Sequence, residues 1–512
     1  MIKSTRQIKV FDIEKLDTYS KKRNCFSEME AFVESGRGTK GQLCALYGLR
    51  RTGKTVLLSQ MAQEKHKQGY KCLYLECSDE EANFIQDQRN SIKHIPEITE
   101  LYDILDKAIE ENYEFIFIDE ISFIRDFVGQ GNLLSNFYAN QGLNIFVTGT
   151  DSLSFVLAAQ DDLYDRLKKI RTTYISFEEY NRLLGKSLEE YIQYGGTLTE
   201  ESPYKNGSST LEYTNTAIVK NIIRSIKQSE HLNGQAITLL YPEKDIISVI
   251  HRCVNQMNQR FLISAINRNY GIYESHPLNL ALHNSKSFPY YEMEKNIQQQ
   301  DIDVIYQALS DLDFAIAVPT YTRINGDIPI YGKELQIISQ AGMIYCHSTE
   351  LLKALVDEEN WNQLEKCGID NKDTFIKRMD RQVKGDILEN LIIFDTYQAF
   401  KEKYYVTKIQ RKSDNKEVDV SVIDKESKET YLFEVKYSNH IEKDHIKNLS
   451  SQSFIEYISE NFGEVKARFV IYTGAPAEIT DSLGDITYIS AEEYLKNITH
   501  CSDILELLGS LT

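Results

Sequence analysis

Apolar residues follow two spacings in the first 180 positions, and the spacing changes several times along the chain. Short apolar runs predict strands at 43–47, 115–118, 143–147 and 172–177, and alternating apolar and polar residues predict one at 71–77. Apolar residues at helical spacing predict helices at 26–33, 54–67 and 98–108. Strands that alternate with helices are typical of an α/β fold, in which a mostly parallel sheet has helices on both faces.

A glycine-containing turn separates the strand at 43–47 from the helix at 54–67. The turn and the start of the helix comprise Gly48, Leu49, Arg50, Arg51, Thr52, Gly53, Lys54 and Thr55. The two glycines let the backbone turn sharply and approach a phosphate, and the helix N-terminus adds partial positive charge. Lys54 can reach the β- and γ-phosphates of ATP, and the Thr55 hydroxyl can ligate Mg²⁺. This order predicts a phosphate-binding loop (P-loop), whereas a chance match would leave only a turn.

Two carboxylates follow the strand at 115–118, in the pattern of a Walker B motif. Neighbouring side chains on a strand face opposite sides, so Asp119 and Glu120 cannot have the same role. We expect Asp119 to hold Mg²⁺, directly or through water, and Glu120 to accept a proton from an attacking water. Two surface acids at the end of a buried strand are the alternative. After a P-loop, the pair indicates that ATP is hydrolysed.

Polar side chains also follow the strand at 143–147. Thr148 and Thr150 are candidates for contact with the γ-phosphate or the attacking water, and a helix cap at Asp151 or Ser152 is equally compatible. Arg166 is a candidate arginine finger or sensor for a neighbouring nucleotide, which predicts an ATP-dependent homo-oligomer. An ordinary surface arginine fits the same position.

Together these motifs resemble those of prokaryotic AAA-family ATP-binding proteins. The shared features are the double arginine of the P-loop, Asp119-Glu120-Ile121, Thr148-Gly149-Thr150, Ile175-Ser176-Phe177-Glu178-Glu179-Tyr180 and Tyr194-Gly195-Gly196. In ATPases of the additional-strand type, the strand at 143–147 lies between the first strand and the Walker B strand. The resemblance covers the whole chain, but its motifs are specific only in the ATPase and in the last domain, which in this family is of unknown function.

The remainder of the chain divides into further parts. Residues 197–214 contain Pro203 and Asn206-Gly207-Ser208-Ser209 and form the predicted linker. We predict a P-loop ATPase domain over 1–197, a helical and winged-helix region over 215–335, a helical connector over 336–383 and an α/β restriction-endonuclease-like domain over 384–512.

The winged helix is predicted from a helix at 302–312, a strand at 314–318 and a hairpin turn at Asn325-Gly326. The predicted recognition helix carries four acids, which are Asp301, Asp303, Asp311 and Asp313. Because acids repel the DNA backbone, we expect this helix to have a structural or partner-docking role instead of reading DNA.

The last domain carries a second candidate site. Glu389 lies on a predicted helix at 385–400, and strands are predicted at 404–410, 417–423 and 430–435. Asp419, Glu434 and Lys436 follow in an order that resembles the PD-(D/E)xK nuclease fold, with Val418 in place of the usual proline. Asp419 and Glu434 can hold Mg²⁺ or Mn²⁺, and Glu389 can add a ligand or orient water. Lys436 shares a strand face with Glu434 and can position or activate the attacking water.

A nuclease-like fold without cutting activity, kept as a binding platform, is the alternative for this domain. A basic cluster near Tyr404 and Tyr405 could bind DNA phosphates, although a solvated face balanced by acids is equally compatible. The cluster comprises Lys401, Lys403, Lys408, Arg411, Lys412 and Lys416.

Composition limits the choice of partners. The 512 residues carry a formal net charge of −18, whereas a protein that mainly coats nucleic acid would be basic. The eight cysteines contain no Cys-x-x-Cys pair, so we expect reduced thiols. No apolar run is long enough to span a bilayer and the first residues lack a secretory signal, so we expect a cytoplasmic protein with no membrane partner.

These observations predict Mg²⁺-dependent ATP hydrolysis that controls a metal-dependent nuclease-like domain, with DNA as the expected substrate. The competing hypothesis is a nucleotide-controlled switch whose inactive last domain docks a protein partner. The acidic chain favours the switch, whereas Glu389, Asp419, Glu434 and Lys436 favour cutting.

Overall fold

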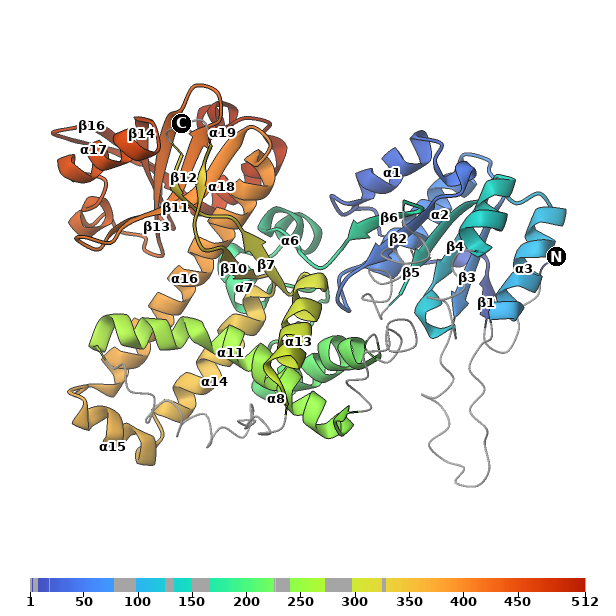
Figure 1. The fold of residues 1–512 in the computed structure, drawn as a ribbon, viewed down its shortest axis with the longest axis horizontal. Helices are drawn as coiled ribbons and strands as arrows, with labels where there is room; N and C mark the ends of the chain where they lie inside the picture. The colour runs from blue at the N-terminus through green and yellow to red at the C-terminus, as the bar shows by residue number, and fades with distance from the viewer. Residues whose placement is uncertain are drawn as a thin grey trace.

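The structure is a computed structural model that describes residues 2, 8–17, 19–77, 98–124, 133–149, 165–224, 226, 240–271, 297–324 and 328–511. Figure 1 shows an α/β part at the N-terminus, a helical part in the middle of the chain and a second α/β part at the C-terminus. No helix among these residues is both long enough and apolar enough to cross a membrane.

The N-terminal sheet has six strands in the order β1-β3-β4-β5-β2-β6. The strands are β1 (Ile8–Phe11), β2 (Leu43–Tyr47), β3 (Cys72–Cys77), β4 (Phe115–Asp119), β5 (Asn144–Thr148) and β6 (Leu167–Arg171). All neighbours pair in parallel except β1, which runs antiparallel to β3. Strand β5 lies between β2 and β4, which confirms the position expected from the additional-strand pattern.

Helices cover both faces of this sheet, because alternate side chains of the central strands point to opposite sides. Helices α1 (Phe26–Glu34) and α2 (Lys54–Lys67) pack on one face, whose core includes Cys44, Phe117 and Phe146. Helix α3 (Ile98–Glu110) packs on the other face. Short helical turns complete this part: η1 (Ile13–Lys15), η2 (Gly38–Lys40), η4 (Ile121–Phe123), η5 (Leu134–Tyr138) and η6 (Ala139–Gln141).

The prediction of a strand at 172–177 is wrong. The last strand is β6, and residues 172–176 lead into helix α6 (Phe177–Leu184), which Ser176 caps by accepting a hydrogen bond from Glu179 N. Ile170 is the one fully buried residue of β6, because this strand lies at the edge of the sheet. An edge strand with so little buried surface leaves no clear apolar pattern.

The predicted linker is a packed segment. It follows helix α7 (Leu188–Tyr194) and includes helix α8 (Gly207–Tyr213). The Tyr204 hydroxyl donates a 2.7 Å hydrogen bond to Gln340 Oε1, and Gly342 N donates one of 2.9 Å to the Gly195 carbonyl. These contacts tie the segment and the end of α7 to the start of helix α14 (Ala341–Leu355), so the polar turn residues here belong to a packed connection and not to a free linker.

The middle of the chain is mostly helical, as expected. Its helices are η7 (Thr214–Val219), α11 (Glu243–Tyr270), α13 (Gln299–Asp311), α14 (Ala341–Leu355) and α15 (Glu358–Lys366). Strand β7 (Ala315–Val318) pairs antiparallel with β10 (Leu335–Ile338), and β8 (Tyr321–Arg323) pairs with β9 (Ile330–Tyr331). The expected turn at Asn325-Gly326 lies outside the described residues.

The C-terminal part begins with the long helix α16 (Lys372–Phe400), which runs without a break past residue 384. Its sheet has the order β11-β12-β13-β14-β16-β15. The strands are β11 (Tyr404–Arg411), β12 (Lys416–Asp424), β13 (Glu429–Lys436), β14 (Glu464–Tyr472), β15 (Ala477–Asp481) and β16 (Gly484–Ser490). The remaining helices are η8 (Lys443–Ile446), α17 (Gln452–Asn461), α18 (Ala491–Asn497), η9 (Ile498–His500) and α19 (Ile504–Leu511).

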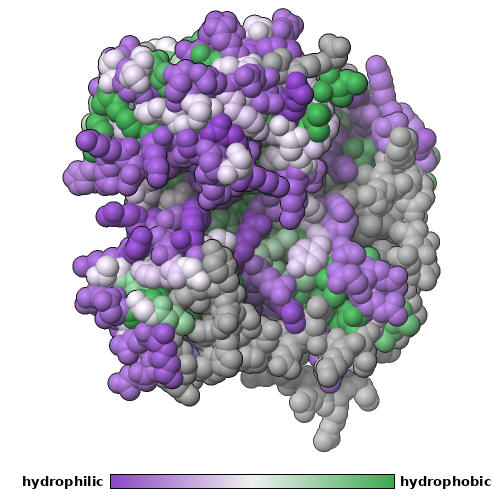
Figure 2. Space-filling model, turned by 60° about the vertical axis from the view of Figure 1, so that its left-hand side comes forward, coloured by the Kyte–Doolittle hydropathy of each residue, from purple (hydrophilic) through white to green (hydrophobic). Residues whose placement is uncertain are grey.

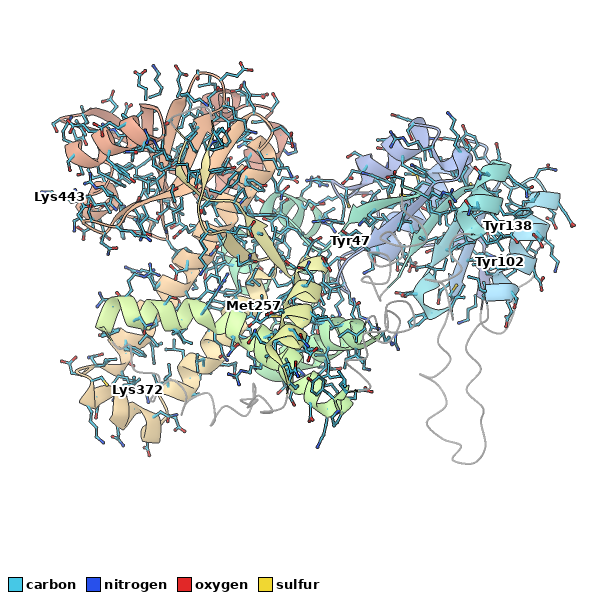
Figure 3. The ribbon with its side chains drawn as sticks, in the orientation of Figure 1. Tyr47, Tyr102, Tyr138, Met257, Lys372 and Lys443 are labelled. Carbon is cyan, nitrogen blue, oxygen red and sulfur yellow. The ribbon has the colours of Figure 1, made fainter. Side chains whose placement is uncertain are left out.

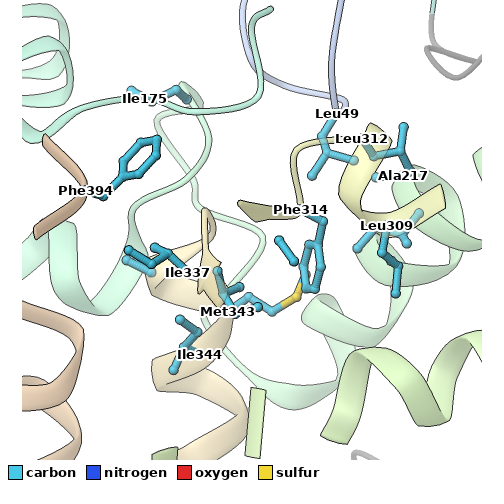
Figure 4. Packing of buried hydrophobic residues seen from close by; sticks show 14 of the residues in the cluster. Leu49, Ile175, Ala217, Leu309, Leu312, Phe314, Ile337, Met343, Ile344 and Phe394 are labelled. Carbon is cyan, nitrogen blue, oxygen red and sulfur yellow. The ribbon is translucent and has the colours of Figure 1, made fainter. Parts of the chain in front are cut away.

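One hydrophobic cluster connects the three parts. Figure 4 shows where Leu49 of the N-terminal part meets Leu312, Phe314 and Met343 of the middle part. Figure 3 places Tyr47, at the end of β2, on the side of the N-terminal part that faces the rest of the molecule, whereas Tyr102 lies on the far side. The turn that follows Tyr47 is therefore close to the middle part.

Candidate functional site

The turn between β2 and α2 has the backbone that a P-loop requires. Gly53 has φ +87° at the start of α2, a conformation that side-chain-bearing residues rarely adopt. A Cβ atom on Gly48 would lie 2.4 Å from Thr172 Oγ1 and 2.8 Å from Thr173 N. Glycine is therefore needed at both positions, for the turn at one and for close packing at the other.

Lys54 lies buried inside this turn. Its ammonium group donates hydrogen bonds of 2.9 Å to the Gly48 carbonyl and 2.8 Å to the Leu49 carbonyl. Burial lowers the pKa of Lys54 to about 8, although the carboxylates of Glu120 and Asp119 act in the opposite direction. Among the described residues, the poorly solvated lysine donates hydrogen bonds only to neutral oxygens, and an anionic phosphate would stabilise its charged form.

The Walker B residues meet the tip of β5. The Thr148 hydroxyl donates to Asp119 Oδ1, and Glu120 N donates a 3.2 Å hydrogen bond to Thr148 Oγ1. Burial raises the pKa of Asp119, and a hydrogen bond with Thr55 opposes that rise. The structure therefore brings Thr55, Asp119 and Thr148 together, whereas Thr150 lies outside the described residues.

Glu120 has a left-handed backbone with φ +56°, which is unusual for a residue other than glycine. Such strain concentrates at active sites, where the surrounding structure holds it in place. Glu120 thus leaves the extended backbone that Asp119 has at the end of β4, in agreement with two different roles.

Arg166 lies away from this site. Its carbonyl accepts a 2.8 Å hydrogen bond from Leu43 N at the start of β2, whereas the P-loop follows the other end of that strand. The five residues of β2 place the two ends of this strand about 16 Å apart. Arg166 can therefore contact only a nucleotide bound by another copy of the chain, and its role stays a prediction.

Arg23 is a residue that sequence reasoning missed. Its guanidinium is buried and donates to the Thr52 carbonyl of the P-loop at 2.8 Å and to the Thr172 carbonyl at 2.7 Å. It also forms an ion pair of 2.9 Å with Glu179. The motif around Glu179 could have suggested a buried partner, but nothing in the sequence around Arg23 identifies it.

The second candidate site gathers four predicted residues from three elements. Asp419 of β12 accepts a 2.8 Å hydrogen bond from Val435 N of β13. Lys436 Nζ lies 2.7 Å from Glu434 Oε1 and 3.5 Å from Asp419 Oδ2. Asp419 and Glu434 are 4% and 5% exposed, so these charges are almost entirely removed from water.

Lys408 belongs to this cluster and joins Glu389 to it. Its ammonium lies 2.8 Å from Glu389, 3.4 Å from Glu417 and 3.7 Å from Asp419. The pairing of β11 with β12 shifts register between Thr407 and Ile409, so Lys408 lies at a β-bulge. Bulges redirect side chains and are common beside active sites.

The basic cluster predicted to bind DNA is largely paired internally. Lys403 pairs with Asp503, and Arg411 pairs with Asp414 at 2.6 Å. Lys416 lies 3.5 Å from Asp414, and Lys408 lies among the carboxylates of the cluster. These four residues therefore fit a surface whose charges are balanced by nearby acids better than a free DNA-binding cluster.

The chemistry of the carboxylates fits a divalent cation. Burial, and then the Asp419 charge, raises the pKa of Glu389 to about 7 and that of Glu434 to about 8. Glu434 Oε2 is buried and has no hydrogen-bond partner among the described residues. The arrangement differs from a formed metal site, because no three His, Cys, Asp or Glu side chains in the described ranges are spaced to hold an ion. Lysine ammonium groups instead lie between the carboxylates.

Comparison with known proteins identifies the N-terminal part. Residues 40–181 match the family model of an AAA domain, so the chain contains an AAA-family ATPase domain with a P-loop. No curated protein matched the chain.

Solved structures show weaker likeness. C. elegans PCH-2 is 22% identical, with a TM-score of 0.23, over 44% of this chain and 63% of its own length. AMPPCP-bound DnaA from Aquifex aeolicus is 12% identical, with a TM-score of 0.21, over 74% of this chain and 98% of its own. The S. cerevisiae Hsp104-ADP complex is 13% identical, with a TM-score of 0.24, over 73% of this chain and 50% of its own. These scores are too low to transfer any property to this chain.

Proposed function

We propose that this chain is a Mg²⁺-dependent ATPase whose nucleotide state controls a metal-dependent nuclease-like site acting on DNA. The AAA domain at residues 40–181 supports ATP binding. The single observation that carries the second activity is the cluster of Glu389, Asp419 and Glu434 with Lys408 and Lys436, in which Asp419 and Glu434 are buried and the other three are half-buried.

In the ATPase, each residue has a separate task. Lys54 leaves the Gly48 and Leu49 carbonyls and binds the β- and γ-phosphates, while the loop N–H groups face the same anion. Thr55 and Asp119 would hold Mg²⁺, which neutralises phosphate charge when bound. Glu120 orients the attacking water and accepts its proton, and Thr148 keeps Asp119 and the Glu120 backbone in place.

Hydrogen bonds from the P-loop support control of the rest of the chain. The Tyr213 hydroxyl donates a 2.8 Å hydrogen bond to the Arg50 carbonyl, and Leu198 N donates one of 2.8 Å to the Arg51 carbonyl. Leu49 N donates to Thr173 Oγ1, whose hydroxyl donates 2.9 Å to the Leu312 carbonyl at the end of α13. A change in the loop on nucleotide binding would therefore reach the middle part directly.

Helix α13 with strands β7 and β10 supports a winged-helix-like unit that passes this change on. Asp301 accepts a 2.7 Å hydrogen bond from the Tyr241 hydroxyl, and Asp313 pairs with Arg171 at 2.8 Å. These acids hold the helix within the molecule, in agreement with a structural or docking role.

In the C-terminal site, Asp419 and Glu434 would hold a divalent cation, which activates a water when bound. Glu389 completes the oxygen donors, and Lys436 positions the attacking water from the same strand face as Glu434. The test is cleavage of plasmid DNA with Mn²⁺ or Mg²⁺, with and without ATP. The wild type should nick DNA, whereas the variant with both Asp419→Ala and Glu434→Ala should not, although its ATP hydrolysis should be unchanged.

The second candidate function is a nucleotide-controlled switch that docks a protein partner. The lysines among the carboxylates favour it, because Lys408 and Lys436 already balance much of the negative charge. Isothermal calorimetry separates the two functions: Mn²⁺ binding lost in Asp419→Ala supports the nuclease. If the protein neither binds Mn²⁺ nor cleaves DNA in any nucleotide state, the nuclease proposal is rejected and the switch is the remaining function.

A further inference from the structure

A cleft separates the middle part from the C-terminal part and opens onto the carboxylate cluster. It has a volume of about 750 Å³ and is lined by α11, the approach to β10, α16 and strands β11 and β12. Figure 2 shows that hydrophilic side chains rim the hollow between the two parts. Glu389, Lys408 and Glu417 line it, so the cleft is continuous with the site proposed above.

The two walls of this cleft carry opposite charge. The wall from the middle part has Arg260, Arg268 and Lys333 against one acid, Glu334. The wall from the C-terminal part has Lys408 against three acids, which are Asp386, Glu389 and Glu417. An anionic ligand would therefore lie along the first wall, with its reacting group toward the second.

Arg260 shows that the basic wall is not fully balanced internally. Its guanidinium is half-buried, donates to the Gln336 carbonyl and has no carboxylate within ion-pair distance among the described residues. Burial lowers its pKa, in agreement with a cation that lacks a counter-charge. Arg268 is more exposed and lies 3.2 Å from Asp386. A phosphate would supply the missing partner of Arg260.

The spacing along α11 fits a chain of phosphates. Arg260, Ser264 and Arg268 recur every four residues, so they face the cleft from successive turns. The eight residues from Arg260 to Arg268 span about 12 Å of helix, so the two guanidinium groups can each contact a different phosphate of one strand. The volume is that of a small-molecule site, which is room for part of one strand.

We propose that this cleft binds single-stranded nucleic acid, with Arg260 and Arg268 as binding residues for its phosphodiester groups. The inference rests on the proposed nuclease-like function and adds the form of its substrate. It also makes the site dependent on two parts of the chain, because one supplies the phosphate contacts and the other the carboxylates. A shift of α11 against α16 would then open or close the substrate path.

Fluorescence anisotropy of the full-length protein with labelled single strands tests this, in EDTA and without ATP. Arg260→Gln and Arg268→Gln should each weaken binding about tenfold. Each should also lower the slope of log K against log salt by about 0.7, as expected for one lost phosphate contact. Arg381→Gln, an exposed arginine of α16 outside the cleft, is the matched control and should bind as the wild type does. Single-stranded DNA and RNA of one sequence show whether the sugar matters.

A paired variant separates binding from folding. Arg268→Gln leaves Asp386 without its cation, whereas Arg268→Gln with Asp386→Asn removes both charges. Binding that stays weak in the double variant supports a phosphate contact, and recovery to the wild-type value overturns the role of Arg268. Equal affinity and salt slope in Arg260→Gln, Arg268→Gln and Arg381→Gln overturn the cleft proposal, and tighter binding of duplex than of single strand overturns its choice of ligand.

The outcome is distinguishable from that of the nuclease proposal. If binding in EDTA depends on the arginines but no metal-dependent cleavage is found, the cleft proposal is kept and the nuclease proposal is rejected. Cleavage that depends on Asp419, together with binding that is insensitive to Arg260 and Arg268, retains the nuclease and rejects the cleft.

Discussion

The Tyr174 hydroxyl donates a 2.6 Å hydrogen bond to Oδ1 of Asp395, joining the AAA domain to helix α16 of the C-terminal part. The Tyr174 ring also packs edge-on against Phe394, with ring centroids 4.4 Å apart. Asp395 is 4% exposed, and its Oδ2 has no hydrogen-bond partner in the described part of the chain. Burial raises the pKa of Asp395 to about 7, so this contact holds a proton at mildly acidic pH.

The Asp395 contact predicts a pH-dependent stability. The unfolded carboxyl ionises near its ordinary pKa of 3.8, whereas the folded one ionises near 7, so the folded state binds more protons between these values. The free energy of unfolding should therefore fall as pH rises through this window and level off above it. The difference corresponds to at most about 4 kcal/mol. Asp395→Asn keeps the acceptor for Tyr174 and should flatten the dependence.

Thermal unfolding at about pH 5 and about pH 8 checks this, because the two values lie on either side of the folded pKa. Asp370→Asn, an exposed acid before the start of α16, is the control and should follow the wild type. An unchanged pH dependence in Asp395→Asn would mean that Asp395 is ionised in the folded protein.

Lys54 predicts a loss of ATP affinity at alkaline pH. Phosphate favours the charged lysine, so bound ATP should raise its pKa above the value of about 8 in the free protein. Affinity should thus be greatest below pH 8 and should fall as pH rises above it. Lys54→Ala should abolish ATP binding, measured with a fluorescent analogue, whereas Lys67→Ala at the exposed end of α2 should leave it intact.

Glu120 should separate binding from turnover. Glu120→Gln keeps the length of the side chain but removes the proton acceptor, so ATP should bind while phosphate release falls at least about 100-fold. Hydrolysis at the wild-type rate would show that another group takes the proton.

The position of Arg166 predicts assembly. Arg166 lies beside the start of β2, whereas the P-loop of the same chain follows the end of that strand. An arginine-finger role therefore requires a second copy of the chain. Light scattering of Glu120→Gln with ATP should show a larger particle than without ATP, and Arg166→Ala should lower hydrolysis per chain. Arg37→Ala, another exposed arginine, is the control. A strict monomer with ATP removes the finger role.

The elements predicted most closely are those buried on every side. The ranges 43–47 and 54–67 agree with β2 and α2 to the residue, because a strand covered on both faces is continuously apolar. Strand β6 was misplaced because it is an edge strand, and β1 was missed because three of its four residues are partly or fully exposed. A buried element therefore has a clear apolar pattern that predicts it, whereas an exposed element does not.

Glu389, Asp419, Glu434 and Lys436 were predicted to lie together, but the second lysine that balances their charge was not. Spacing within one strand placed Glu434 beside Lys436, since the side-chain period of a strand is fixed. The place of Lys408 depends on the bulge between β11 and β12, which no local pattern signals. Lys408 was therefore assigned to a DNA-binding surface, because the sequence shows its charge but not its direction. Arg23 was missed for a similar reason, since its partners lie far along the chain.

Lys408 gives the sharpest test of how the cluster is neutralised. Lys408→Met keeps most of the apolar stem but removes a cation that lies 2.8 Å from Glu389 and 3.7 Å from Asp419. Removing one partner from this half-buried ion pair leaves a poorly compensated charge, so the protein in EDTA should lose roughly 1 to 3 kcal/mol of stability, between the costs for exposed and buried pairs. Added Mn²⁺ should stabilise this variant more than the wild type, because in the variant the metal no longer competes with the Lys408 ammonium for the carboxylates. Thermal unfolding with EDTA and with Mn²⁺ measures both effects, and Lys412→Met, an exposed lysine on the turn after β11, is the matched control. Mn²⁺ that stabilises neither protein would show that the lysines, and not a metal, are the permanent counter-charges of these carboxylates.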